Sequence, residues 1–138
     1  MNKYEELIEK AFEARNYAYA PYSKFKVGAA LLCADGTIYK GCNVENASYP
    51  ATNCAERTAI FHAVSEGITE FEAIAIVGGP ADATQVGFCA PCGVCRQVMR
   101  EFCNPESFEI ILANSSGDYK VYTLEELLPM SFGPENLG

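Results

Sequence analysis

An Asp35-Gly36 dipeptide lies between two apolar runs that cover residues 26–33 and 38–44. Asp-Gly readily adopts the positive φ angles that a tight hairpin turn requires, so this arrangement is a strong short-range signal for two paired strands. The sequence therefore predicts an antiparallel hairpin, and with it a sheet that begins near the start of the chain.

Helical and strand patterns alternate along the rest of the chain. The predicted helices cover residues 2–17, 53–66 and 92–103, and the further strands cover residues 71–77, 108–113 and 119–122. Thr123 and Glu126 have the spacing of a capping box for a short final helix, which Pro129 ends. This order predicts an α/β fold, a three-layer α-β-α sandwich whose mixed sheet has about five strands, with one or two βαβ crossovers. At 138 residues, the chain is expected to form a single domain over residues 1–138.

The charge of the chain limits what it can bind. Its formal net charge is −8, and no cluster of lysine and arginine offsets it. Such a surface repels phosphate backbones, so nucleic-acid and anionic-membrane binding are disfavoured and an uncharged small molecule is favoured. No run is long enough to span a membrane, and the first residues lack the apolar core of a signal peptide. The seven cysteines are an odd number, so we expect intracellular thiols in a cytoplasmic protein rather than a disulfide framework.

Three of the cysteines share one setting. Cys54, Cys92 and Cys95 all lie at predicted helix starts, where unpaired N–H groups and the helix dipole favour the thiolate that binds metal. Three protein ligands without a fourth are typical of catalytic zinc, which keeps one position open for water. His62, the single histidine, lies more than two turns beyond Cys54, so we interpret it as a packed or partly exposed helix residue.

Glu56 follows Cys54 by two residues, and the later Pro91-Cys92-Gly93-Val94-Cys95 completes the signature of zinc-dependent nucleobase deaminases, whose glutamate is an acid and base. Three thiolates weaken the pull of the metal on its water; Arg57 could offset this by hydrogen bonding to ligand sulfurs, or could form a surface salt bridge instead. Other interpretations remain. Glu56 could be the N3 partner of a cap at Asn53, the cysteine pair could be a redox dithiol, and the zinc could be structural.

Beyond the zinc motif, the chain closely resembles the cytidine deaminase family, in its short, single-domain form that assembles as a homotetramer. The resemblance extends over nearly the whole chain. It is carried by residues 19–23 (YAPYS), 25–30 (FKVGAA), 41–50 (GCNVENASYP), 54–57 (CAER) and 91–97 (PCGVCRQ), and by Leu127-Leu128-Pro129 before Phe132.

The resemblance implies hydrolytic deamination of cytidine and deoxycytidine to uridine and deoxyuridine, a reaction of pyrimidine salvage that releases ammonia. One zinc ion per subunit, held by Cys54, Cys92 and Cys95, would activate water for attack on C4 of the base, and Glu56 would move the protons. Asn43 and Glu45 would bind the ribose 3′-hydroxyl. The remaining contacts implied by the resemblance are Phe25 against the pyrimidine, the Ala55 backbone at the base, and Tyr49 and Phe132 from a neighbouring subunit.

The chain departs from the family before Pro91. The family commonly has glycine-proline-x-serine there, whereas this chain has Gly87-Phe88-Cys89-Ala90, which leaves the substrate contacts of this loop and the role of Cys89 open. A relative that deaminates blasticidin S shares the zinc motif, but the Asn43-to-Asn46 segment and Phe132 favour cytidine. The short acidic chain also disfavours a deaminase that edits polynucleotides.

Overall fold

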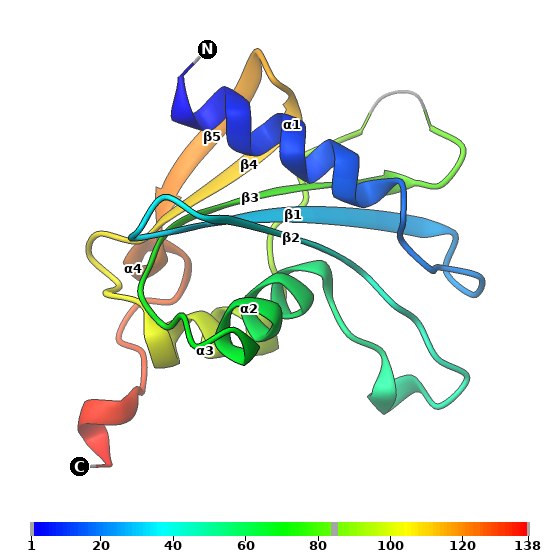
Figure 1. The fold of residues 1–138 in the computed structure, drawn as a ribbon. Coiled ribbons are helices and arrows are strands. Elements are labelled where there is room, and N and C mark those ends of the chain that lie inside the picture. The colour runs from blue at the N-terminus through cyan, green and yellow to red at the C-terminus, as the bar shows by residue number, and fades with distance from the viewer. Residues whose placement is uncertain (1, 84–85, 138) are drawn as a thin grey trace.

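The computed structural model, which describes residues 2–83 and 86–137, contains one five-stranded sheet in the order β2-β1-β3-β4-β5 (Figure 1). The β3–β4 pair is parallel and the other three pairs are antiparallel, so the sheet is mixed, as predicted. Its strands are β1 (Phe25–Cys33), β2 (Ile38–Cys42), β3 (Phe71–Pro80), β4 (Glu109–Ser115) and β5 (Asp118–Thr123). Strand β3 continues to Pro80, three residues beyond the predicted end, because Gly78 and Gly79 still pair with β1.

Helices cover both faces of this sheet. Helix α1 (Lys3–Arg15) lies on one face, while α2 (Ala55–Ser65) and α3 (Gly93–Phe102) lie on the other (Figure 1). The three-layer α-β-α architecture is therefore confirmed, with α3 as the crossover of a single βαβ unit between β3 and β4. A short helix α4 (Leu124–Leu127) starts at the predicted capping box of Thr123 and Glu126. No helix among the described residues combines the length and the apolar character that crossing a membrane requires.

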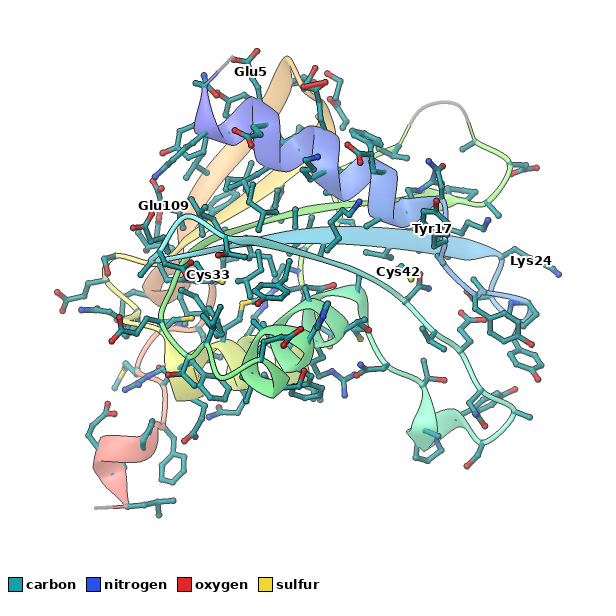
Figure 2. The ribbon with its side chains drawn as sticks, viewed as in Figure 1. Glu5, Tyr17, Lys24, Cys33, Cys42 and Glu109 are labelled. Carbon is teal, nitrogen blue, oxygen red and sulfur yellow. The ribbon has the colours of Figure 1, made fainter. Side chains whose placement is uncertain are left out.

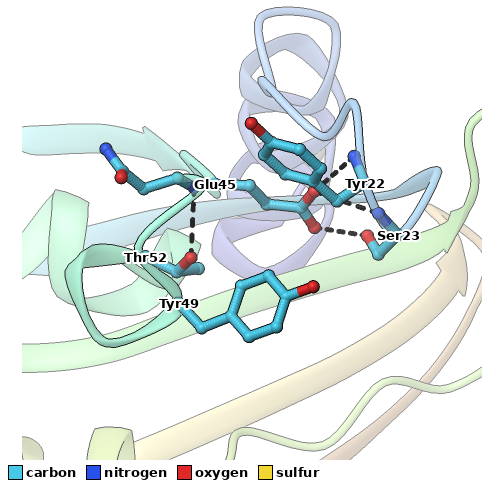
Figure 3. Close-up of a pocket in the computed structure, with 6 residues that line it drawn as sticks. Tyr22, Ser23, Glu45, Tyr49 and Thr52 are labelled. Carbon is cyan, nitrogen blue, oxygen red and sulfur yellow. Dashed lines mark hydrogen bonds between the residues drawn. The ribbon is translucent and has the colours of Figure 1, made fainter.

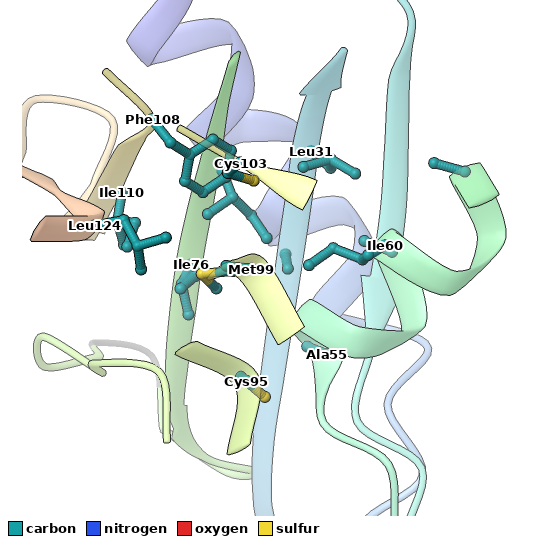
Figure 4. Packing of buried hydrophobic residues seen from close by; sticks show 14 of the residues in the cluster. Leu31, Ala55, Ile60, Ile76, Cys95, Met99, Cys103, Phe108, Ile110 and Leu124 are labelled. Atoms are coloured by element: carbon teal, nitrogen blue, oxygen red, sulfur yellow. The ribbon is translucent and has the colours of Figure 1, made fainter. Parts of the chain in front are cut away.

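Each strand divides its side chains between two cores, because successive residues of a strand point to opposite faces. On β3, Ile74 and Ile76 face α2 and α3, while the smaller Ala73 and Ala75 face α1. We call the first cluster the α2/α3 core; it includes Leu31, Ile60, Met99 and Phe108, which are almost completely buried (Figure 4).

The predicted hairpin joins β1 and β2 in antiparallel register, with Ala29 opposite Gly41. Gly36 has a φ of 91°, and the Thr37 N–H donates to the Asp35 carboxylate over 2.9 Å, which explains why Asp-Gly suits this turn. Figure 2 shows that Cys33, which ends β1, lies at one end of the sheet, while Lys24, just before β1, lies at the other.

Two glycines allow helices to approach the hairpin closely from opposite faces. A Cβ atom on Gly28 would lie 2.0 Å from the Ala11 carbonyl oxygen of α1, and one on Gly41 would lie 2.4 Å from the Ala55 carbonyl oxygen of α2. Only a residue without a side chain fits at these distances. Gly41 therefore determines how near the start of α2 lies to the sheet.

Candidate functional site

The three predicted thiols come together at the starts of two helices. Cys54 is the N-cap of α2, Cys92 is the N-cap of α3, and Cys95 lies in the first turn of α3. The Cys54 and Cys92 sulfurs are 3.8 Å apart and the Cys92 and Cys95 sulfurs 3.5 Å apart, and all three lie within 4.8 Å of one another. Neither N-cap cysteine uses its side chain to cap its helix, so both sulfurs remain available as ligands.

This geometry fits a zinc ion. With Zn–S bonds of about 2.3 Å and tetrahedral angles, neighbouring sulfurs lie about 3.8 Å apart. The sulfur separations of 3.8 and 3.5 Å are close to that value. Cys95 is buried and Cys92 is exposed, so the cluster has a closed side and an open side. Three thiols with one open side can hold a metal and still admit a small ligand.

Hydrogen bonds within the cluster and from Arg57 favour the negatively charged thiolate form of Cys54. Hydrogen bonding by the Cys95 thiol, followed by the Arg57 guanidinium, lowers the pKa of Cys54 to about 5. The Arg57 Nη2 group donates to the Cys54 sulfur over 3.2 Å. Shared hydrogen bonding with Cys54, together with burial, raises the pKa of Cys95. Arg57 thus faces a ligand sulfur, and no ion pair between it and a carboxylate occurs among residues 2–83 and 86–137.

Glu56 is buried beside this cluster, with only 4% of its surface exposed. Burial, reinforced by the negative charge of Cys54, raises the pKa of Glu56 to about 7. The alternative that Glu56 partners a cap at Asn53 is wrong, because α2 is capped by Cys54 and the Asn53 amide donates instead to the Thr58 hydroxyl. A buried carboxyl group that can both hold and release a proton near neutral pH is suited to acid–base chemistry.

His62 and Cys89 lie outside the thiol cluster. The His62 ring packs edge-on against Tyr39 and lies 3.7 Å from the Glu66 carboxylate, with about half of its side chain exposed, consistent with a partly exposed helix residue. Cys89 packs against Gly78, and burial raises the pKa of its thiol to about 11. Cys89 thus packs against β3 and is not one of the three clustered thiols.

A second predicted site residue, Glu45, is connected to the thiol cluster through backbone hydrogen bonds. Val44 forms two backbone hydrogen bonds of 2.9 Å with Asn53, the residue before Cys54. On its other side, the Glu45 N–H donates to the Tyr19 carbonyl over 2.8 Å. The loop that carries Glu45 is therefore held between the start of α2 and the segment that precedes β1.

The Glu45 carboxylate lines a pocket (Figure 3), and sequence reasoning missed its closest partners. It accepts hydrogen bonds from the Tyr22 and Ser23 backbone N–H groups over 3.0 and 3.1 Å, and from the Ser23 hydroxyl. Tyr22 and Ser23 belong to the YAPYS motif, which carried the family resemblance without a role for either residue. The pocket is lined by Tyr22, Ser23, Glu45, Asn46, Tyr49 and Thr52.

The other predicted substrate residues lie in different settings. Asn43 is 9% exposed, and its amide group accepts from the Val27 N–H and donates to the Phe25 carbonyl, each over 2.9 Å. Asn43 thus fixes the start of β1, whose first residue, Phe25, has an exposed side chain. The side chain of Ala55, in the first turn of α2, is fully buried.

Phe132 lies in the segment after α4 and is 55% exposed. Two residues of α3 hold this segment: Gln97 donates to the Phe132 carbonyl over 2.9 Å, and Arg100 donates to the Ser131 hydroxyl over 2.8 Å and pairs with Glu135. The structure does not bring Phe132 to the pocket of Glu45 within one chain. No local sequence pattern distinguishes Arg100 from a surface arginine of α3, so this anchor was not predicted.

Comparisons with known proteins agree with this site. A family model described as the cytidine and deoxycytidylate deaminase zinc-binding region matches residues 1–109. A relative from Sporosarcina psychrophila, named cytidine deaminase, is 53% identical over 133 residues, which cover 96% of this chain and 93% of the relative. One of the same name from Halalkalibacterium halodurans is 51% identical over 131 residues and 95% of each chain.

Comparison of the fold with solved structures points to the same protein family. The crystal structure of cytidine deaminase from Burkholderia pseudomallei superposes with a TM-score of 0.84 at 52% sequence identity, and the match covers 96% of this chain and 100% of that one. The family resemblance seen in the sequence motifs is thus confirmed over almost the whole chain. Together with the thiol cluster and the buried Glu56, these matches establish that the chain belongs to the cytidine and deoxycytidylate deaminase family of enzymes.

Proposed function

We propose that this protein is a zinc-dependent deaminase that hydrolyses cytidine and 2′-deoxycytidine to uridine and 2′-deoxyuridine, with release of ammonia, in pyrimidine salvage. The observation that carries this proposal is the meeting of three thiols at two helix starts, with the Glu56 carboxyl buried two residues from the Cys54 ligand. The names of the relatives from Sporosarcina psychrophila and Halalkalibacterium halodurans support cytidine as the substrate.

Cys54, Cys92 and Cys95 would hold one zinc ion per subunit. When bound, zinc supplies a nucleophile near neutral pH by lowering the pKa of water. Glu56 would take a proton from that water, deliver it to N3 of the pyrimidine as oxygen adds to C4, and then pass a proton to the amino group. The C4–N bond breaks, ammonia leaves, and the ring retains the oxygen, so the reaction is balanced by one water molecule.

The proposed substrate contacts follow the loop geometry. Glu45 would bind the sugar in its pocket and Asn43, which follows β2 and bonds to the start of β1, would assist, while Phe25 would cover the pyrimidine. The backbone of Ala55, at the start of α2, would meet the base. A net charge of −8 and an acidic group in the pocket favour a neutral nucleoside over a nucleotide.

We further propose a homotetramer in which neighbouring subunits complete the site through Phe132 and Tyr49. Both side chains are exposed in the single chain, at 55% and 76%. Large exposed aromatic side chains are typical of surfaces that another protein covers.

The test is the conversion of cytidine to uridine, followed by ultraviolet absorbance, for the zinc-loaded wild type and for Glu56→Gln. We expect the variant to retain zinc, because Glu56 is not a ligand, and to lose at least about 100-fold in kcat, because general acid–base groups contribute that much. Glu66→Gln is the matched control, because it makes the same substitution at an exposed residue at the C-terminal end of α2. Its kcat and zinc content should equal those of the wild type. Absence of conversion by zinc-loaded wild type would refute the assignment to cytidine.

A further inference from the structure

The Glu45 carboxylate is already partly satisfied by the protein. Its Oε1 atom accepts two backbone N–H groups, from Tyr22 over 3.0 Å and from Ser23 over 3.1 Å, and its Oε2 atom accepts the Ser23 hydroxyl (Figure 3). An ionised carboxylate has about four acceptor positions, two on each oxygen. Three of them are therefore occupied, and the one that remains is on Oε2.

The Ser23 hydroxyl can point its proton in only one direction. The Phe25 backbone N–H donates to the same Ser23 oxygen over 3.1 Å, so that oxygen acts as the acceptor in this bond. A hydroxyl group has a single proton to donate. Because an ionised carboxylate and a backbone N–H leave only one arrangement, in which Ser23 donates to Glu45 and accepts from Phe25, one side chain links the carboxylate in the pocket to the first residue of β1.

The turn that carries Ser23 is held in place on both sides. Lys24, the next residue, has a φ of 59°, a left-handed conformation that is uncommon for a residue with a side chain. Its N–H donates to the Ala20 carbonyl over 3.1 Å, and its carbonyl accepts from the Ala81 N–H over 2.7 Å. Such a conformation persists only where surrounding contacts hold it, so the direction of Ser23 toward Glu45 is set before a ligand arrives.

We propose that Ser23 is a positioning residue for the sugar recognition assigned to Glu45. Its hydroxyl group orients the carboxylate so that Glu45 offers one acceptor to one hydroxyl donor, and the preference for a nucleoside with a free 3′-hydroxyl group therefore depends on Ser23. This inference rests on the proposed function, in which Glu45 binds the sugar. Two consequences follow. A 3′-deoxy nucleoside leaves the last acceptor of Glu45 unpaired, and a 3′-phosphate brings a second negative charge against an ionised carboxylate.

The test compares cytidine with 3′-deoxycytidine for the wild type, Ser23→Ala and Ser23→Thr. The wild type should favour cytidine by at least about 100-fold in kcat/KM, since a site built to bind a hydroxyl group rejects an analogue that lacks it. Ser23→Ala should lose about tenfold in kcat/KM for cytidine, mostly through KM, which is typical of one charge-assisted hydrogen bond. Its kcat/KM for 3′-deoxycytidine should stay within about twofold of wild type, and Ser23→Thr should restore the preference.

An equal loss on both substrates would overturn the proposal, because Ser23 would then support the turn without affecting sugar recognition. Ser48→Ala, at an exposed serine of the Glu45 loop whose hydroxyl makes no hydrogen bond to Glu45, is the matched control. If zinc-loaded wild type converts no cytidine, the proposed reaction fails, and calorimetric binding of uridine and 3′-deoxyuridine tests Ser23 separately. A selective tenfold loss of uridine affinity in Ser23→Ala would support the positioning role, and equal affinities would refute it.

Discussion

Substitution of Gly41 by alanine should weaken zinc binding indirectly. Gly41 lies on β2, against the start of helix α2, and Cys54 is the N-cap of that helix. The new Cβ would lie 2.4 Å from the Ala55 carbonyl oxygen and 2.5 Å from the Ala59 nitrogen, which are the acceptor and donor of one helical turn in α2. These are backbone atoms, so no flexible side chain can move aside. Because Cβ contacts below 3.0 Å are essentially never found, the helix must retreat by about 0.6 Å, the difference between 3.0 and 2.4 Å.

That displacement is large for a metal ligand. Zinc–ligand distances are held to within about 0.2 Å, so moving the start of α2 by about 0.6 Å shifts Cys54 beyond this tolerance while Cys92 and Cys95 stay on α3. We expect Gly41→Ala to lower the free energy of unfolding by about 1–3 kcal/mol, as overpacked sites do. Zinc affinity should fall by about 10- to 100-fold, similar to losses seen when the support of a ligand is removed.

Chemical denaturation of the metal-free protein measures the first quantity, and competition with a chromogenic zinc chelator measures the second. Gly28→Ala is the matched control, because its Cβ would meet the Ala11 carbonyl oxygen at 2.0 Å, but against α1 on the other face of the sheet. It should be destabilised at least as much and keep its zinc affinity within about twofold. Equal zinc affinity in the two variants would refute the argument, since a loss of stability alone would then account for both.

Two further predictions concern the cluster and the core. Arg57→Gln removes the 3.2 Å hydrogen bond to the Cys54 sulfur, so the pKa of that thiol should rise. Protons should then displace zinc at a higher pH when the protein is acidified, which a zinc-sensitive dye would detect. An unchanged pH midpoint of zinc release would contradict this prediction. Met99→Ala should lower the free energy of unfolding by about 2–5 kcal/mol, because Met99 is fully buried in the α2/α3 core. Chemical denaturation measures this change, and a loss below about 1 kcal/mol would contradict that packing.

The success of the sequence predictions follows from the range over which each signal acts. The hairpin at Asp35-Gly36 and the capping box at Thr123 depend on residues within a few positions, and both were confirmed. The alternative of a cap at Asn53 was wrong, although asparagine is a favoured N-cap residue, because local preference alone does not decide where a helix begins. Cys54 is the N-cap instead, so that one of the three clustered thiols lies at the helix start, and the Asn53 side chain donates to the Thr58 hydroxyl.

The pocket illustrates the opposite case. Glu45 and Ser23 are 22 residues apart, and nothing in their local sequence indicates that the serine hydroxyl donates to the carboxylate. The bond exists because the Glu45 loop is held against the segment before β1 by backbone hydrogen bonds to Tyr19. The anchoring of Glu135 by Arg100, 35 residues away, could not be predicted for the same reason.

Residue types and short spacings were sufficient to indicate zinc and acid–base chemistry. The reactivity of a thiol at a helix start, and of a carboxyl group two residues beyond it, depends mainly on residues close in the sequence. They also indicated the sandwich, through the periodicity of strands and helices. Only the folded chain decides that the sulfurs of Cys54 and Cys92, 38 residues apart, lie 3.8 Å from each other. That distance depends on how closely α2 and α3 pack on one face of the sheet, and on Gly41, whose missing side chain gives α2 its place.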